Sequence, residues 1–368
     1  MGKGNSIAAN ALALRPTGQV HGLTGQNRMI HPNGAFGTFL RVAVTVLFLT
    51  LLGCSGTDTA PTLGIGAPAS DWMANVPNNT PISLLGIPGT HDTGTYIKGS
   101  DFFGYVKTQD REIVDQLDHG IRFLDIRGTL YKNSLPIHHG PVDLGFDFQY
   151  VIDQCKLFLR QHPTETILLN LGDEYEHGEP TASYHHVFLN YYNANKYLDA
   201  PTPPTRELWY LGTTIPTLGS VRGKIVLMRS FALDQPGDAL GIDVPGGQNS
   251  AYYSHQFSAN PDQTLYIENL WTPDNCDNAY VDKMNAVGPN ITRKQNDRSP
   301  NHLYMTWTSG TEPPKFPSFC AKTPRDFANA INPWFVRVVA AQSGPVGIVI
   351  MDFPGDDIIG RIIDSNNY

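Results

Sequence analysis

The sequence predicts an α/β protein whose parallel strands close into a barrel of the TIM type. Apolar runs of strand length alternate along the chain with segments of helical periodicity. Several of the strand segments are apolar at every position, which is typical of parallel strands that are covered on both faces. About eight strand segments fall within about 300 residues, and this number favours a closed barrel over an open sheet.

The expected elements follow one another in a regular order. Strands are expected at residues 82–87, 121–126, 135–138, 166–171, 224–228, 265–267, 303–306 and 346–351. Helices are expected at residues 111–118, 148–159, 184–192 and 327–339. Gly120 ends the first helix, the second stops before Pro163, and the last is expected to be interrupted near Pro333.

The amino-terminal part differs from the rest in composition. Residues 1–57 contain no acidic residue, and within them Arg41 precedes an apolar stretch at 42–52 that is followed by small residues. This pattern is typical of a signal peptide, since a bilayer span needs roughly 20 residues. We therefore expect export, with a membrane anchor through the same stretch as the alternative. Residues 58–70 are rich in Pro, Gly, Thr and Ala and predict a linker, so 71–368 should form the barrel domain.

The charge of the chain limits its partners. The net charge is −8, and removing the four positive charges of residues 1–57 leaves −12 for the remainder. Nucleic-acid binding favours a basic face, so no nucleic-acid partner is expected. We expect a monomer.

The positions of the cysteines indicate a buried thiol and a possible disulfide. Cys155 lies on the apolar face of the expected helix at 148–159, which predicts a buried thiol. Cys276 and Cys320 lie in loop-like sequence and could form a disulfide in an oxidising compartment. Because no CxxC occurs, a cysteine zinc site is not expected.

Polar residues gather where the expected strands end. The residues at or just after these ends are His91, Asp92, Asp125, Arg127, His139 and Asp352. In a parallel barrel the carboxyl ends of the strands meet at one face, so these side chains should lie close together. Two imidazoles supply acid–base groups near neutrality, and a guanidinium binds phosphate oxygens. The motifs therefore predict acid–base chemistry on a phosphate ester.

The ordered motifs also carry a family resemblance. The segments at 87–95, 123–128, 138–141, 162–166, 223–228 and 348–353 resemble, in this order, the X domain of bacterial-type phosphatidylinositol-specific phospholipase C. The resemblance covers roughly residues 72–368 and implies a distorted TIM barrel. It also implies a phospholipid substrate at a membrane surface, cleaved by intramolecular attack to diacylglycerol and inositol cyclic phosphate.

The resemblance implies a role for each catalytic residue. His91 would be the general base that takes the proton of the inositol 2-hydroxyl, and His139 the general acid that protonates the departing diacylglycerol oxygen. Asp352 would hold His91 in the correct tautomer, and Asp92 would do the same for His139.

Arg127 bears on the use of metal. By resemblance it would bind the phosphate oxygens, with Asp125 orienting it, and it stands where metal-free relatives have an arginine. We therefore expect no cofactor. The alternative is a Ca²⁺ site made by Asp92, Asp125 and Asp173, although a guanidinium among these carboxylates would repel the ion.

The headgroup-binding residues depart from the family pattern. The family's lysine after the fourth strand is replaced within Asn170–Glu174, where Asp173 and Glu174 are expected in a solvated loop. Arg229, Asn269 and Trp271 are the substrate-binding candidates, and phosphatidylinositol is the default substrate. The alternatives are a metal-dependent barrel phosphodiesterase acting on another phospholipid or a glycerophosphodiester, and a non-catalytic lipid-binding barrel.

Overall fold

The computed structural model describes residues 69–96, 101–174, 178–198, 205–235, 237–273, 275–314 and 320–366. The extension at 1–57, with its signal-peptide-like stretch, and most of the linker at 58–70 lie outside these residues, so the expectations for them stay predictions. Within the described ranges no helix combines the length and apolar character needed to cross a membrane.

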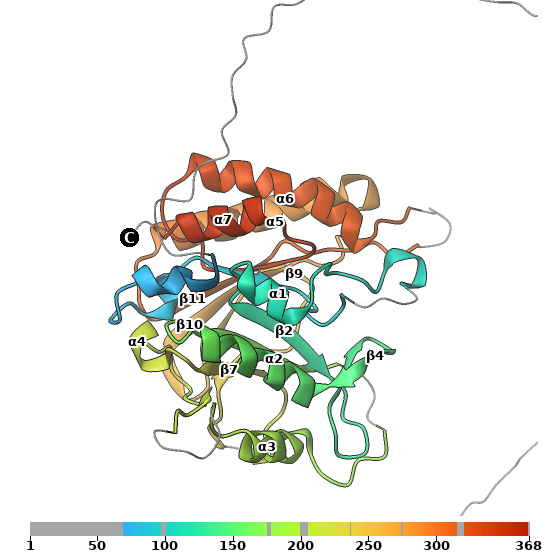
Figure 1. Ribbon diagram of the computed structural model, residues 1–368. Helices are drawn as coiled ribbons and strands as arrows, with labels where there is room; N and C mark the ends of the chain where they lie inside the picture. Colours follow the sequence, from blue (N-terminus) through green and yellow to red (C-terminus); the bar gives the residue numbers. More distant parts are fainter. Residues whose placement is uncertain are drawn as a thin grey trace, which may run out of the picture. The chain divides into compact units, whose positions relative to one another are not determined.

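The strands form one sheet (Figure 1). They are β1 (Ile87–Thr90), β2 (Phe123–Gly128), β3 (Pro136–His139), β4 (Val142–Asp147), β5 (Ile167–Asp173), β6 (Trp209–Tyr210), β7 (Ile225–Ser230), β8 (Ile242–Asp243), β9 (Ser250–Phe257), β10 (Asn260–Asn269), β11 (His302–Trp307) and β12 (Ile348–Met351). The order is β6-β7-β5-β2-β1-β12-β11-β10-β9, with β8 also paired to β7. Neighbours from β6 to β10 run parallel, and β9 joins β10 as an antiparallel hairpin.

The barrel is distorted at the seam between β8 and β9. In the part of the chain that the structure describes, these two strands do not pair with one another. Side chains bridge the seam instead: His255 Nε2 lies 2.9 Å from Asp243 Oδ2, and the Ser258 hydroxyl donates to the same oxygen at 3.0 Å. The expected fold class, a distorted TIM-type α/β barrel, is confirmed.

Helices cover the outside of the strands. They are α1 (Ile113–Asp118), α2 (Phe148–Gln161), α3 (Tyr184–Ala194), α4 (Leu218–Val221), α5 (Ala279–Asn296), α6 (Pro324–Ala341) and α7 (Asp356–Asp364). Short 3₁₀ helices lie at Ala69–Asn75, Ile82–Leu84, Phe102–Gly104 and Cys276–Asn278. Figure 1 shows α5, α6 and α7 side by side, and α1 against α2.

Three expected elements are wrong in detail. The strand expected at 135–138 is not a parallel barrel strand, because β3 pairs antiparallel with both β2 and β4 and lies outside the barrel order. The strand expected at 82–87 begins only at Ile87, because Ile82–Leu84 forms a 3₁₀ turn whose first side chain is fully buried. The last long helix runs through Pro333 without interruption, since Ile331 and Phe335 on either side are buried in the core and hold the helix in place.

The amino-terminal end of the barrel is closed by the 3₁₀ segment Ala69–Asn75. The buried Arg122 donates to Glu165 Oε2 from Nε at 2.9 Å and from Nη2 at 2.8 Å, and to the Ser70 carbonyl at 2.6 Å. Trp72 and Met73 are buried in the same region. A buried charge needs such partners, so this segment belongs to the folded domain.

The cysteines lie as expected. The Cys155 thiol is buried, and burial raises its pKa above the usual range. Cys276 and Cys320 form a disulfide that ties the start of α5 to the segment before α6.

Candidate active site

The six motif residues meet at one face of the barrel, as expected, although β3, which carries His139, runs antiparallel to β2 and lies outside the barrel order. They line one cavity of about 420 Å³. His91 directly follows β1, and its backbone N–H donates to the Met351 carbonyl at 3.0 Å, which holds it beside β12. Asp92 has a positive φ of 40°, a conformation that costs energy for a residue with a Cβ and that is concentrated at functional sites.

His91 is held by a carboxylate on each ring nitrogen. Its Nδ1 lies 2.8 Å from Asp352 Oδ1, and its Nε2 lies 3.3 Å from Asp92 Oδ2. Burial alone lowers the pKa of His91, but the charges of Asp92 and Asp352 outweigh this effect and raise the pKa to about 9. The free site therefore favours the imidazolium form of His91.

Asp92 is the centre of the cluster. Its Oδ2 also lies 3.3 Å from His139 Nε2, and its Oδ1 lies 2.8 Å from Arg127 Nε. Burial tends to raise the pKa of Asp92, but Arg127, His91 and His139 lower it to about 2. One buried carboxylate thus faces both Nε2 atoms and the guanidinium.

His139 is oriented by a backbone group that the sequence could not indicate. Its Nδ1 donates to the Val106 carbonyl at 2.8 Å, and Asp92 lies at the other nitrogen. A proton on Nδ1 leaves Nε2 to gain or lose a proton at the cavity. The tautomer of His139 is therefore set by the Val106 carbonyl, whereas the resemblance assigned this task to Asp92.

Arg127 is surrounded by carboxylates. Beside its contact with Asp92, its Nη2 lies 3.0 Å from Asp125 Oδ2 and its Nη1 lies 3.4 Å from Glu174 Oε2. Burial tends to lower the pKa of Arg127, but Asp125, Asp92 and Glu174 raise it well above its usual value. The guanidinium is thus a fixed positive charge at the cavity wall, and Asp125 contacts it as the resemblance implied.

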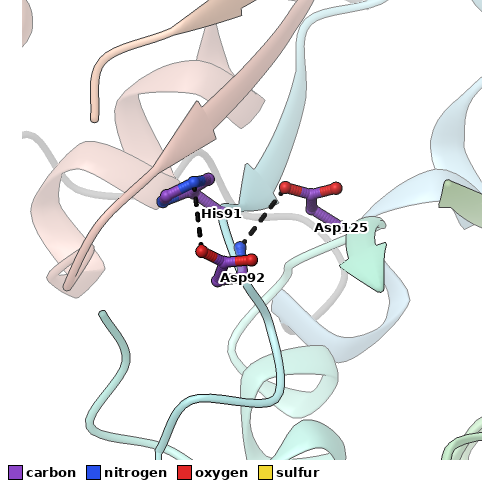
Figure 2. Close-up of side chains that lie close together, drawn as sticks. All are labelled: His91, Asp92 and Asp125. Carbon is purple, nitrogen blue, oxygen red and sulfur yellow. Dashed lines mark hydrogen bonds and ion pairs between the residues drawn. The ribbon is translucent and has the colours of Figure 1, made fainter. Parts of the chain in front are cut away.

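Three ligand-type side chains lie close enough to surround a cation. Figure 2 shows His91 and Asp92 in contact, and the Asp92 backbone N–H directed at Asp125, 3.4 Å from its Oδ2. One ligand atom from each residue lies within 4.8 Å of the others. However, Arg127 contacts both carboxylates, so its positive charge already neutralises the oxygens that calcium would need. Asp173, the third residue of the calcium alternative, lines the same cavity but is exposed, and the group of close ligand atoms consists of His91, Asp92 and Asp125.

The structure separates the three headgroup candidates. Asn269 and Trp271 line the cavity. Arg229 does not: its Nε donates to the Leu240 carbonyl at 3.1 Å and its Nη2 pairs with Asp243 at 2.5 Å. Successive side chains of a strand point to opposite faces, so the next residue of β7, Ser230, lines the cavity instead. The expectation that Arg229 lies in the headgroup pocket is wrong.

Some pocket residues were not expected. Glu174, expected in a solvated loop, has a side chain only 17% exposed, and burial raises its pKa despite Arg127. Asn170 donates to Asp125 Oδ1 at 3.1 Å and accepts from the Ser230 hydroxyl at 2.8 Å. Asn170 and Gly172 lie two positions apart on β5, and this period of two was the available signal, whereas Asp173 and Glu174 both line the cavity where the strand ends. Aromatic lining comes from Tyr105, Tyr253 and Trp307.

Comparisons with known proteins agree with this geometry. Residues 86–230 match the family model described as phosphatidylinositol-specific phospholipase C, X domain. A 1-phosphatidylinositol phosphodiesterase of Listeria monocytogenes is 30% identical over 81% of this chain and 85% of its own length. One from Staphylococcus aureus (strain Newman) is 27% identical over 80% of this chain and 94% of its own length.

Solved structures show the same likeness. A structure of Staphylococcus aureus phosphatidylinositol-specific phospholipase C, from work on its membrane binding, matches with a TM-score of 0.69 and 25% identity, covering 82% of this chain and 98% of that one. The Listeria monocytogenes enzyme matches with a TM-score of 0.62 and 26% identity, covering 82% of this chain and 100% of that one. The chain therefore belongs to the phosphatidylinositol-specific phospholipase C family that carries the X domain.

Proposed function

We propose that the chain cleaves phosphatidylinositol to diacylglycerol and inositol cyclic phosphate, with His91 and His139 as its acid–base pair. The observation that carries this proposal is the placement of both Nε2 atoms 3.3 Å from one oxygen of Asp92, beside Arg127. Two imidazoles that face a common point next to a guanidinium suit a phosphodiester held between them.

The reaction follows from these positions. Neutral His91 takes the proton of the inositol 2-hydroxyl at Nε2, and the freed oxygen attacks phosphorus. The bond to the diacylglycerol oxygen breaks as His139 Nε2 gives that oxygen a proton. Asp352 stabilises the imidazolium form of His91, and Arg127 neutralises the charge that builds on the non-bridging oxygens. The phosphate stays on the inositol as a cyclic diester.

The setting of the enzyme is part of the same proposal. The substrate lies in a membrane surface, the enzyme works as a monomer, and the signal-peptide-like stretch at 42–52 directs it out of the cell. The Cys276–Cys320 disulfide supports an oxidising destination. The reaction needs no metal, because Arg127 supplies the positive charge at phosphorus.

A lipid panel tests the proposed reaction. The protein is incubated with vesicles that contain phosphatidylinositol, phosphatidylcholine, sphingomyelin or phosphatidylglycerol, and the phosphorylated products are identified by phosphorus NMR. The cyclic phosphate should appear with phosphatidylinositol alone, and the H91A variant should give none. Release of a phosphorylated headgroup from another lipid, with phosphatidylinositol left intact, would overturn the proposed substrate.

A further inference from the structure

Glu174 joins two separate parts of the site. Its Oε1 accepts a hydrogen bond from the Gly140 backbone N–H at 2.9 Å, and its Oε2 lies 3.4 Å from Arg127 Nη1. The side chain is 17% exposed, so both contacts are made largely out of water. The reaction described above gives Glu174 no task.

The Gly140 contact matters because of where His139 stands. His139 ends β3, and Gly140 turns the chain with a φ of +53° into β4. β3 pairs with the barrel strand β2 at one register position, Gly128 with Ile137, and otherwise pairs with β4. The hairpin that carries His139 is therefore joined to the barrel by few strand hydrogen bonds.

Glu174 supplies a tie from the barrel to this hairpin. It directly follows β5, which pairs with β2 over six positions and is part of the rigid sheet. A carboxylate is a strong acceptor for a backbone N–H. Its bond to Gly140 therefore fixes the turn next to His139 at a set distance from Arg127, the group that faces the phosphate.

We propose that Glu174 is a positioning residue that holds the general-acid turn, His139–Gly140, in register with the phosphate-binding arginine. The proposal rests on the proposed function, in which His139 protonates the leaving oxygen. It predicts that Glu174 matters most when the leaving group needs a proton. An alkoxide such as that of diacylglycerol is a strong base and needs one, whereas a nitrophenolate leaves without one.

The experiment compares two water-soluble inositol phosphodiesters, one with an alkyl leaving group and one with a 4-nitrophenyl leaving group. Replacing Glu174 by Ala should lower kcat on the alkyl ester by about 10- to 100-fold, a part of what general acid catalysis contributes, and on the aryl ester by less than about 3-fold. KM should change little on either ester. E174Q keeps an oxygen for the Gly140 N–H and should keep most of the alkyl rate.

Two further variants serve as references. H139A should show the same selective loss on the alkyl ester, only larger. E179Q changes an exposed acid whose side chain is 80% accessible and which lies outside the cavity, so it should leave both rates unchanged.

The outcomes separate the inference from the function on which it rests. Equal losses on both esters in E174A, or a raised KM on both, would overturn the positioning role and assign Glu174 to phosphate binding through Arg127. If E174A does not fold, the same comparison is made with E174Q, where a large and equal loss on both esters has the same meaning. If H139A loses both rates equally, His139 is not the general acid and the proposed function itself fails.

Discussion

The two carboxylate oxygens of Asp92 connect the charged groups of the site. Its two oxygens contact both catalytic imidazoles and the Arg127 Nε, at 2.8–3.3 Å. A buried carboxylate without such partners would cost several kcal/mol, so the histidines and the arginine also stabilise Asp92 in its charged form. Asp92, the two histidines and the Arg127 guanidinium therefore form one electrostatic unit.

From this we predict that the two histidines act together. H91A and H139A should each lower kcat on phosphatidylinositol by at least about 10²-fold, and the double variant should be scarcely worse, because residues that act as one unit are not additive. Circular dichroism should show that the fold is intact. Activity near that of the wild type in either single variant would contradict the assignment.

A second prediction concerns pH. His91 must be neutral to act as a base, and the neighbouring carboxylates raise its pKa to about 9. The value of kcat/KM should therefore rise with pH through the range above the ordinary pKa of 6.5. D352N removes one of these charges and lowers the pKa of His91, so this rise should move to lower pH and reach a lower plateau. If the rise of kcat/KM stays at the same pH in D352N, a group other than His91 controls the pH dependence.

The same shift has a consequence for stability. A group whose pKa is higher in the folded than in the unfolded state stabilises the fold below its unfolded pKa. The contribution of His91 should be complete below about pH 6.5 and lost as the pH rises to about 9. Denaturant unfolding of the wild type and H91A across this range measures it.

A third prediction concerns metal. Activity should survive EDTA and should not rise with added calcium, because Arg127 already neutralises Asp92 and Asp125. R127K should lose much of the rate although it keeps the charge, since one ammonium cannot reproduce the paired donors of a guanidinium. If EDTA removes the wild-type rate and calcium restores it, the carboxylates form a metal site and this reading of Arg127 is wrong.

At the scale of elements, hydrophobic pattern predicted the strands that are apolar throughout. The strands expected at 121–126, 166–171 and 224–228 correspond to β2, β5 and β7, each reaching two residues further. α5 was missed because its buried face includes Lys283, Asn290 and Lys294, which break the apolar period. The alternation of Val142, Leu144 and Phe146 was a usable signal for β4, which was also missed.

The same limits apply to the candidate site. Residues after strand ends could be brought together from topology alone, and so His91, Arg127 and Asp352 were found. The direction of a single side chain depends on the register of its strand, which is why Arg229 was misplaced by one residue and Ser230 stands in the pocket. The hydrogen bond from His139 to the Val106 carbonyl could not be predicted from the sequence, because every residue has a carbonyl and only the fold determines which one faces His139.

At the scale of the whole molecule, the two ends of the barrel have different tasks. The carboxyl ends of the strands hold the cavity, whereas the amino-terminal end is closed by Ala69–Asn75 over the Arg122–Glu165 pair. The contributions of residues to catalysis and to stability can therefore be tested separately, by substitutions at opposite ends of the barrel. A substitution or deletion at the closed end should lower the free energy of unfolding and leave the catalytic rate of the folded molecules unchanged.

The last prediction uses this separation. A protein beginning at residue 58 should fold and turn over substrate like one beginning at residue 53, because residues 1–57 contain no acidic residue and, beyond the apolar stretch at 42–52, no core periodicity. A protein beginning at residue 76 loses buried Trp72 and Met73 and the Ser70 carbonyl that accepts from Arg122. Burial of two large side chains contributes roughly 3–6 kcal/mol, so its melting temperature should fall by about 5–10 °C. Equal melting of the proteins beginning at 58 and 76 would show that this segment does not stabilise the barrel. A much lower melting temperature for the protein beginning at 58 than at 53 would show instead that residues 53–57 contribute to the folded domain.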